Sequence, residues 1–280
     1  MHVAEAASLA CLLEASARKP GNVAPGRAFR DTRYEDFLAS AVAIGPVLGS
    51  ADSRPLGETV RRCLEATRRW TRANTNLGIV LLLAPLARAA LSRAGGTLRE
   101  RLWSVLRATT VADAAQVYEA IRLAHPGGLG DAPEQDVGAA PTVTLRESMA
   151  LAAARDTIAA EYVTDFSVTF DIAVPALRAA RQDGLAWDDA VVELALTVLG
   201  QVPDTLIARK LGLAEAEAVS ARAREALAAG GVRSFAGREA VDALDRSLLD
   251  PQNRRNPGTT ADLTAAALFV VIFEDWSTQA

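Results

Sequence analysis

Lysine is rare in this chain. Of its 30 basic residues only Lys19 and Lys210 are lysines, and the others are arginines. A lysine retained in such a chain indicates a place that needs a compact point charge, which the planar guanidinium of arginine does not provide. Lys19 stands where a helical pattern ends in the turn Lys19-Pro20-Gly21-Asn22. It could contact a phosphate there, or it could complement the negative end of the helix dipole.

Carboxylates form a second group that could take part in binding or catalysis, because they stand beside predicted helix starts and loops or inside mostly apolar helices. Converging carboxylates could hold Mg²⁺ next to a polyphosphate, since Mg²⁺ takes one or two carboxylates together with substrate oxygens and water. Some of them have a simpler interpretation as helix N-caps, and others as an ion-paired, solvated helix face. The acids in question are Asp31, Asp36, Asp113, Asp136, Asp156, Glu161, Asp204 and Asp262.

Three short segments of amides and small residues complete the set. Asn74-Thr75-Asn76 precedes an apolar helix and could cap it or bind a ligand at its positive end. Pro126-Gly127-Gly128-Leu129-Gly130 would let the backbone approach a phosphate, and Asn256–Asp262 again places small residues and a carboxylate at a helix start. Each segment alone is typical of an ordinary turn. Together they indicate an anionic, polyphosphate-bearing substrate held between helix ends.

Composition and motif content exclude several other kinds of protein. The net charge of −4 excludes a strongly basic nucleic-acid binder. Cys11 and Cys63 lie in apolar helical patterns and are predicted to be reduced core residues. Two histidines, His2 and His125, are too few for a His-rich zinc site, and His125 before Pro126 is predicted to end a helix. No Ser or Cys nucleophile signature is present.

The elements that must position these residues are helical throughout. Apolar residues recur every three or four positions along the chain, and alternating patterns of strand length are absent. We therefore predict an all-α protein of about a dozen helices without a sheet, forming one compact domain over residues 1–280. Capping-box spacing marks helix starts at Thr32, Thr110, Thr144 and Thr259.

Membrane segments are not expected. The two most apolar runs, Leu77–Leu91 and Leu263–Phe273, are shorter than the roughly 20 residues that a bilayer requires and are predicted to be buried helices. Met1–Ala10 lacks the basic region of a signal peptide. The expectation is a cytoplasmic protein that contacts neither membrane nor nucleic acid.

The order of these segments resembles that of the triphosphoribosyl-dephospho-CoA synthase family along nearly the whole chain. Lys19-Pro20-Gly21 is similar to its Pro-Lys-Pro-Gly turn, and Asp31 precedes a helix as in that family. Further similarities, in chain order, are Asn74-Thr75, Arg155 with Glu161, Asp204-Thr205 with Arg209, and Pro257-Gly258-Thr259-Thr260-Ala261-Asp262-Leu263. Where the family has Asn-Thr-His-Lys-Gly, this chain has Asn74-Thr75-Asn76-Leu77-Gly78, and Phe29 stands in place of a histidine.

The resemblance implies an all-α transferase that uses ATP and 3′-dephospho-CoA. Such enzymes displace adenine from the ribose of ATP and build the prosthetic group of decarboxylase acyl carrier proteins. The departures also resemble a divergent branch associated with tetrahydromethanopterin, for which a phosphoribosyl transfer onto a pterin-type precursor would be the reaction. A helical protein that binds a nucleotide without turnover is a third possibility. A homodimer is possible in each case.

These considerations give a predicted site for ATP and Mg²⁺. The predicted catalytic residues are Asp31, Glu161 and Asp204. The predicted nucleotide- and acceptor-binding residues are Lys19, Asn22, Asn74, Asn76, Gly128, Arg155, Arg209 and Thr260. The predicted metal ligands are Asp113, Asp156 and Asp262. Lys19 and Mg²⁺ are expected to hold the triphosphate, while an aspartate orients or deprotonates the acceptor hydroxyl.

Overall fold

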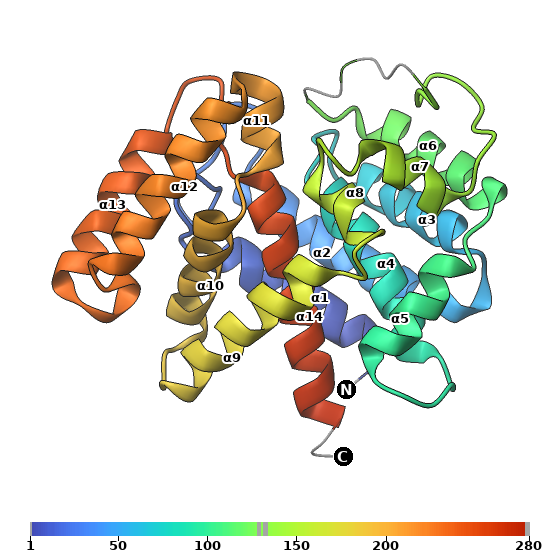
Figure 1. Cartoon of the computed structure of the whole chain (residues 1–280), viewed down its shortest axis with the longest axis horizontal. Coiled ribbons are helices and arrows are strands. Elements are labelled where there is room, and N and C mark those ends of the chain that lie inside the picture. Colours follow the sequence, from blue (N-terminus) through green and yellow to red (C-terminus); the bar gives the residue numbers. More distant parts are fainter. Residues whose placement is uncertain (1, 128–129, 131–133, 278–280) are drawn as a thin grey trace.

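The computed structural model describes residues 2–127, 130 and 134–277. Over these residues the chain forms fourteen α-helices and no strand beyond one isolated bridge, so the all-α prediction is confirmed (Figure 1). The α-helices are α1 (Val3–Ser16), α2 (Tyr34–Leu48), α3 (Leu56–Arg68), α4 (Leu77–Leu91), α5 (Leu98–Arg107), α6 (Val111–Ala124), α7 (Leu145–Ala152), α8 (Thr157–Glu161), α9 (Val174–Gln182), α10 (Trp187–Gln201), α11 (Thr205–Leu211), α12 (Leu213–Ala228), α13 (Phe235–Leu248) and α14 (Gly258–Ser277).

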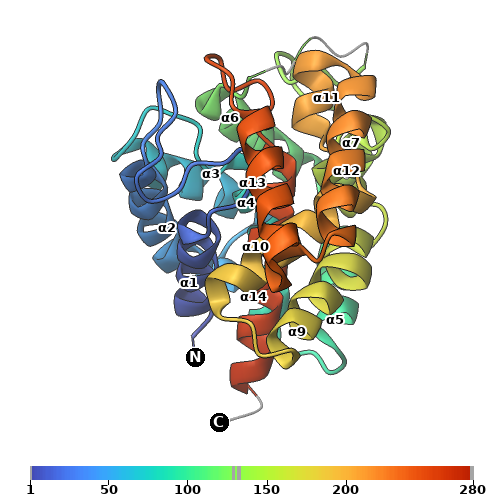
Figure 2. The same cartoon turned by 90° about the vertical axis from the view of Figure 1, so that its left-hand side faces the viewer.

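Helix α14 runs through the middle of the molecule in both views (Figures 1 and 2). It packs against α1, α4, α9 and α10. All residues from Leu263 to Ile272 are at most 3% exposed, which confirms the prediction of a buried helix. A helix that is apolar on every side must be covered on every side, because any face left in water would forfeit the gain from burial.

Helix α4 is the second apolar core helix and also confirms its prediction. It continues through Pro85, although a proline removes one backbone hydrogen bond inside a helix. Its last turn is tied to the neighbouring segment by Arg88, which donates to the backbone carbonyl of Ala51 over 3.0 Å. Cys11 and Cys63 are buried in the same core as free thiols, as predicted.

Two of the four predicted capping boxes form as expected. Thr110 accepts from the backbone of Asp113 over 3.1 Å at the start of α6, and Thr144 caps α7 in the same way. The prediction at Thr32 is wrong, since α2 starts one residue later with a box built by Arg33 and Asp36.

The predicted box at Thr259 is also wrong. Helix α14 already begins at Gly258, so Thr259 and Asp262 both lie within its first turns. The Thr259 hydroxyl is instead 3.1 Å from that of Thr205, at the start of α11. The Asp262 carboxylate therefore does not cap this helix.

The periodic segment from Met149 to Tyr162 forms two helices instead of one. The side chain of Asp156 accepts hydrogen bonds from the backbone N–H groups two and three residues later, at 2.9 and 3.4 Å. An aspartate N-cap starts a new helix. Arg155 therefore stands in the turn between α7 and α8, whereas Glu161 lies in α8.

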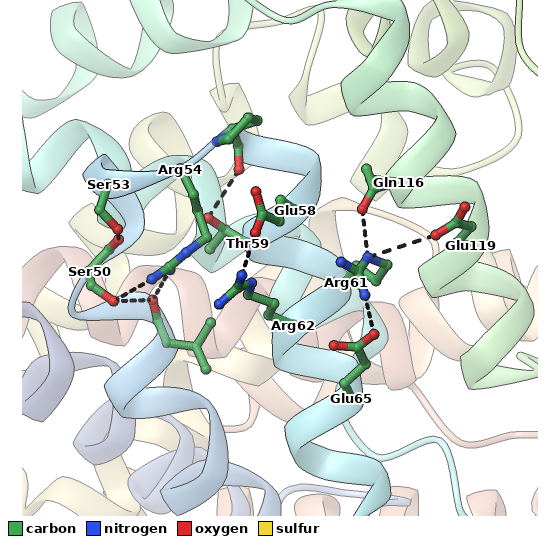
Figure 3. Close-up of polar contacts among 12 residues, drawn as sticks. Ser50, Ser53, Arg54, Glu58, Thr59, Arg61, Arg62, Glu65, Gln116 and Glu119 are labelled. Carbon is green, nitrogen blue, oxygen red and sulfur yellow. Dashed lines mark hydrogen bonds and ion pairs between the residues drawn. The ribbon is translucent and has the colours of Figure 1, made fainter.

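A surface network on α3 joins this helix to α6, as Figure 3 shows. Arg61 donates to Gln116 over 2.5 Å and also contacts Glu65 and Glu119. Gly57 at the start of α3 permits the close approach of the two helices, because a Cβ atom there would lie 2.6 Å from the Cα of Asp113. This junction fixes α6 and thereby one wall of the cavity described below.

Within the described part of the chain, no single helix has both the length and the apolar composition to cross a bilayer. Helices α10 and α11 meet those criteria only when taken together, and they are bent by 55° relative to each other.

Candidate functional site

A cavity of about 820 Å³ lies where the ends of several helices meet. Its lining comes from the segment after α1, the starts of α4 and α14, the end of α6, and helices α7, α8 and α11. In Figure 1 these elements gather in the upper middle of the view, with α11 on one side and α6 to α8 on the other. Residues far apart in sequence thus face one common space of a size typical of ligand sites.

Two long helices, α4 and α14, begin at this cavity. Asn74 Oδ1 accepts from the first N–H of α4, and the next two N–H groups, those of Gly78 and Ile79, have no acceptor in the described ranges. These two groups and the positive end of the helix dipole therefore lie at the cavity. Gly78 in this first turn lets Asp262 of α14 come close, because a Cβ atom at Gly78 would lie 2.5 Å from Asp262 Cγ. The two helix starts are therefore packed directly against each other.

Asp262 presents a carboxylate to the cavity. It is partly exposed there, and no hydrogen bond or ion pair links it to another residue in the described ranges. Burial raises its pKa well above the usual range, and the negative charges of Glu14, Asp204 and Asp156 raise it further, while Arg209 opposes them. Several acids with little compensation at one place are typical of a functional site.

Lys19 does not line the cavity. It is 1% exposed, and its ammonium lies 2.9 Å from Glu14 Oε1 while also donating to the backbone carbonyls of Glu14 and Ala17. Glu14, by contrast, does line the cavity. Lys19 is thus committed to a buried ion pair that positions the Glu14 carboxylate, and it does not stand in the place predicted for a phosphate contact. Glu14 was not among the predicted site residues.

Lys210 is the lysine that faces the cavity. Its half-buried ammonium donates to the backbone carbonyl of Asn253 over 3.3 Å, and no carboxylate pairs with it among the described residues. Burial lowers the pKa of its ammonium, although Asp204 and Asp31 act in the opposite direction. The scarcity of lysine applied equally to Lys210, but this residue lies in the last turn of a helix, where a lysine ordinarily complements the helix dipole.

Arginines supply further positive charge to the same space. Arg30 and Arg155 line the cavity with exposed side chains, and neither forms an ion pair within the described ranges. Arg209 also lines the cavity, where it is paired with Asp156, and its buried Nε atom has no partner in the described part of the chain. Arg155 and Arg209 were predicted at the site; Arg30 was not.

Four other predicted residues line the cavity as well. Asp31 is exposed there, and among the described residues it accepts only from the hydroxyl of Thr32, over 3.2 Å. Asn22 donates to the carbonyl of Pro20 over 3.3 Å, and the Oδ1 of Asn74 accepts from a backbone N–H of α4 over 3.1 Å. Asn76 is 4% exposed and is described further below.

Two of the predicted catalytic acids lie outside the cavity lining. The carboxylate of Glu161 is fully buried and accepts from the backbone N–H groups of Val168 and Thr169 at 2.8 and 3.0 Å, and from the Thr169 hydroxyl. Burial raises its pKa despite these bonds. Glu161 is the last residue of α8, and its carboxylate binds the first N–H groups of the following helical segment, so its role is structural.

Asp204 is the second of these acids. One oxygen caps α11 by accepting from two backbone N–H groups at 2.9 and 3.1 Å, and the other accepts from the N–H (2.8 Å) and hydroxyl (2.9 Å) of Thr260. Burial raises the pKa of Asp204, and the four hydrogen bonds act against this rise. Asp204 and Thr260 therefore join the starts of α11 and α14 behind the cavity wall.

The three predicted metal ligands are not gathered. Asp113 is away from the cavity lining, and its oxygens accept from Thr110 and from the backbone N–H of Gly57 over 2.8 Å. Asp156 is held by its N-cap bonds and by Arg209, which leaves Asp262. In the described ranges no three His, Cys, Asp or Glu side chains form a group fit for a metal ion. The residues present do not fit a protein-built metal centre.

The Gly-rich loop is described in part only. Gly127 and Gly130 line the cavity, whereas the predicted residue Gly128 lies outside the described residues. His125 ends α6 in the left-handed conformation with a φ of 48°, which confirms the predicted helix termination. Its side chain also lines the cavity.

Comparisons with known proteins identify the family of the chain. The chain is similar to the 2-(5''-triphosphoribosyl)-3'-dephosphocoenzyme-A synthase of Klebsiella pneumoniae, with 36% identity over 99 residues that cover 35% of each protein, so the match spans about a third of the relative's length. A crystal structure from Archaeoglobus fulgidus, described as a candidate triphosphoribosyl-dephospho-CoA synthase, has a TM-score of 0.66 and 32% identity, covering 85% of this chain and 99% of that one. The family model described as ATP:dephospho-CoA triphosphoribosyl transferase matches residues 1–279, and this chain belongs to that family.

Proposed function

We propose that the protein transfers the triphosphoribosyl group of ATP to a hydroxyl group of 3′-dephospho-CoA and releases adenine. Membership of the family supports this reaction. The observation that carries it is the set of cations around the cavity that lack carboxylate partners in the described ranges, namely Arg30, Arg155 and Lys210. Uncompensated positive charge at a cavity edge favours a strongly anionic ligand.

These cations suit a triphosphate in particular. Arginine offers a planar fork of donors that matches two phosphate oxygens, whereas Lys210 offers one compact charge, so the two types serve different points along a phosphate chain. The orphan N–H groups at the start of α4 add positive potential close by. The exposed side chains of Arg30 and Arg155 would lose motional freedom on binding, which is offset by charge-assisted hydrogen bonds.

The reaction exchanges one bond at the anomeric carbon of the ribose. The bond from this carbon to the adenine nitrogen breaks, a bond to the acceptor oxygen forms, and the acceptor's hydroxyl proton ends on adenine in the overall balance. Positive charge develops on the sugar ring meanwhile, as in glycosyl transfer. Asp262 offers an unpartnered carboxylate at the cavity for this charge, and Glu14, fixed by Lys19, offers a second.

Asp31 is the residue we assign to the acceptor hydroxyl. Its carboxylate is accessible in the cavity and accepts a single hydrogen bond from a neighbouring side chain. A general base needs such an accessible oxygen within reach of the proton that it receives. Glu161 and Asp204 lack that access, because the hydrogen bonds described above occupy their oxygens. We therefore assign to these two acids the positioning of helices α8, α11 and α14.

Magnesium enters this proposal only as the partner of the triphosphate. The carboxylates of the chain do not fit a resident metal centre, as described above. Mg²⁺ commonly keeps several water ligands and binds chiefly to substrate phosphates. Each step assigned here to a residue is independent of a metal ligand supplied by the protein.

The test follows free adenine. Purified protein is incubated with ATP, Mg²⁺ and 3′-dephospho-CoA, and adenine is quantified by chromatography. We expect adenine release that requires the acceptor and that falls strongly in the variant Asp31→Asn. Absence of adenine with this acceptor, or unchanged turnover in the variant, would contradict the proposal. A parallel incubation with a pterin-type acceptor tests the alternative reaction, in which a pterin precursor receives the phosphoribosyl group. The names of the relatives do not favour this alternative.

A further inference from the structure

Two amide side chains at the cavity, those of Asn76 and Asn256, have a buried oxygen without a partner in the described ranges, and Asn76 is the more buried residue. Asn76 precedes α4, lines the cavity and is 4% exposed. Its Nδ2 donates to the hydroxyl of Thr67 over 2.9 Å, which fixes the side chain. Its Oδ1 atom is buried and has no hydrogen-bond partner among the residues that the structure describes. Because a buried acceptor without a partner is costly, such an atom at a cavity indicates a ligand that supplies the missing donor.

A second unpartnered acceptor lies beside it. Asp262 packs over Gly78, two residues after Asn76, and a Cβ atom at Gly78 would overlap its carboxylate. Its oxygens receive no hydrogen bond from any residue in the described ranges. In either protonation state a carboxyl group keeps an acceptor oxygen. Two acceptors, one just before α4 and one in the first turns of α14, are thus open at one place.

Donors are present at the same place. In the first turn of α4 the N–H of Leu77 donates to Asn74 Oδ1, whereas the N–H groups of Gly78 and Ile79 have no acceptor among the described residues. Gly78 is also the residue against which Asp262 packs. A ligand group that fits here must donate to the two side chains and accept from the backbone. A hydroxyl group does both, whereas a metal cation cannot accept and an ammonium group cannot accept either.

We infer that Asn76 and Asp262 each accept a hydrogen bond from one of the two neighbouring hydroxyl groups of a nucleotide's ribose, with the start of α4 donating to the hydroxyl oxygens. This inference rests on the proposed function, which supplies a ribonucleotide as the donor substrate. It adds that the cavity selects ribose over deoxyribose. It also brings the sugar against Asp262, where positive charge develops during transfer.

Binding of three nucleotides tests the inference without relying on turnover. The affinities of the full chain for ATP, 2′-deoxy-ATP and 3′-deoxy-ATP are measured by isothermal titration calorimetry. A hydrogen bond to a charged or buried group contributes enough for a preference of roughly 10- to 100-fold for ATP over each analogue. Equal binding of the three nucleotides, or no binding of any of them, overturns the inference.

Variants assign the two hydroxyl groups. Asn76→Leu is expected to abolish the preference against one deoxy analogue and Asp262→Ala the preference against the other. Asn76→Asp keeps an acceptor oxygen and is expected to retain the preference, so it shows that a loss in Asn76→Leu does not come from misfolding. The matched control is Asn256→Leu, because Asn256 also has a buried, unpartnered Oδ1 at this cavity. If that control removes the preference while Asn76→Leu keeps it, the assignment is wrong.

A titration in EDTA separates hydroxyl recognition from metal binding. The preference for ATP is expected to persist without Mg²⁺, and its loss would mean that the two side chains hold a cation, which overturns the inference. The outcomes also separate this inference from the proposed function. A preference for ribose without adenine release contradicts the proposed function alone, whereas adenine release with equal binding of deoxy analogues contradicts the inference alone.

Discussion

Replacing Gly78 by alanine is the sharpest perturbation of the cavity. A Cβ atom at this position would lie 2.5 Å from both Asp262 Cγ and Ile158 Cδ1, and closer still to Asp262 Oδ2. Ordinary carbon–carbon contacts are about 3.5–4.0 Å, so the neighbours must move. Since Gly78 has an ordinary helical φ, backbone strain plays no part in the expected result.

The size of the effect follows from two opposing contributions. Overpacking of a filled site costs about 1–3 kcal/mol, whereas alanine is better than glycine in a helix by about 1 kcal/mol. We expect a net destabilisation of roughly 0–2 kcal/mol, which lowers Tm by a few degrees. Loss of affinity is the larger effect, because Asp262 moves away from the start of α4, and ATP binding should weaken by roughly tenfold or more.

Differential scanning fluorimetry and calorimetric titration with ATP measure the two effects. The matched control is Gly95→Ala, since a Cβ atom at Gly95 meets nothing within 4 Å and this residue does not line the cavity. A double variant, Gly78→Ala with Asp262→Ala, should recover part of the stability without recovering affinity. If Gly78→Ala and Gly95→Ala behave alike in both assays, the reasoning about this contact is refuted.

Three further predictions test the roles assigned to charged residues. Lys19→Met breaks a buried ion pair and should lower the free energy of unfolding, measured by chemical denaturation, by about 3–5 kcal/mol. Lys210→Met should instead keep near-normal stability and bind ATP roughly tenfold more weakly. The reverse pattern would show that Lys19 is the phosphate contact. Glu161→Gln keeps one acceptor oxygen and leaves one of two buried N–H groups, that of Val168 or Thr169, unsatisfied, so it should lose about 1–3 kcal/mol of stability. We expect an unchanged kcat per folded molecule, and a lowered kcat at normal stability would show that Glu161 is catalytic. Asp262→Asn should stabilise the unliganded protein at pH 7, because a carboxyl whose pKa is raised by folding contributes stability below its unfolded pKa that is lost as pH rises through the folded value. This advantage should shrink as urea denaturation is repeated toward pH 4, and a gain that does not vary with pH would contradict the assigned pKa direction.

Much of the fold was predictable from local patterns. Apolar residues at spacings of three and four indicate helices. The two most apolar runs are too short to cross a bilayer and too apolar to face water, so they were predicted to be core helices. The Asp113 carboxylate also belonged to a recognisable capping box, although it was assigned to a metal. Local chemistry thus explained that aspartate better than the proposed long-range role did.

The sequence predicted which segments form the candidate site, but not the role of each residue in them. Asp31 and Asn74 were predicted beside helix starts, and both line one cavity together with Arg155. Glu161 and Asp204 carry no sequence signal that distinguishes a buried, fully bonded carboxylate from an accessible one. The partners of Glu161 lie seven and eight residues later, beyond the spacing of any common cap.

The sequence by itself determined that the chain is helical and that its polar residues gather at helix ends. Only the tertiary structure decided which charges are compensated. Lys19 meets Glu14 and is neutralised in the interior, whereas Lys210 meets a backbone carbonyl and stays available to a ligand. The physical reason is that a charge acts on a ligand only when packing leaves it unpaired and open to a cavity, and packing depends on residues distant in sequence.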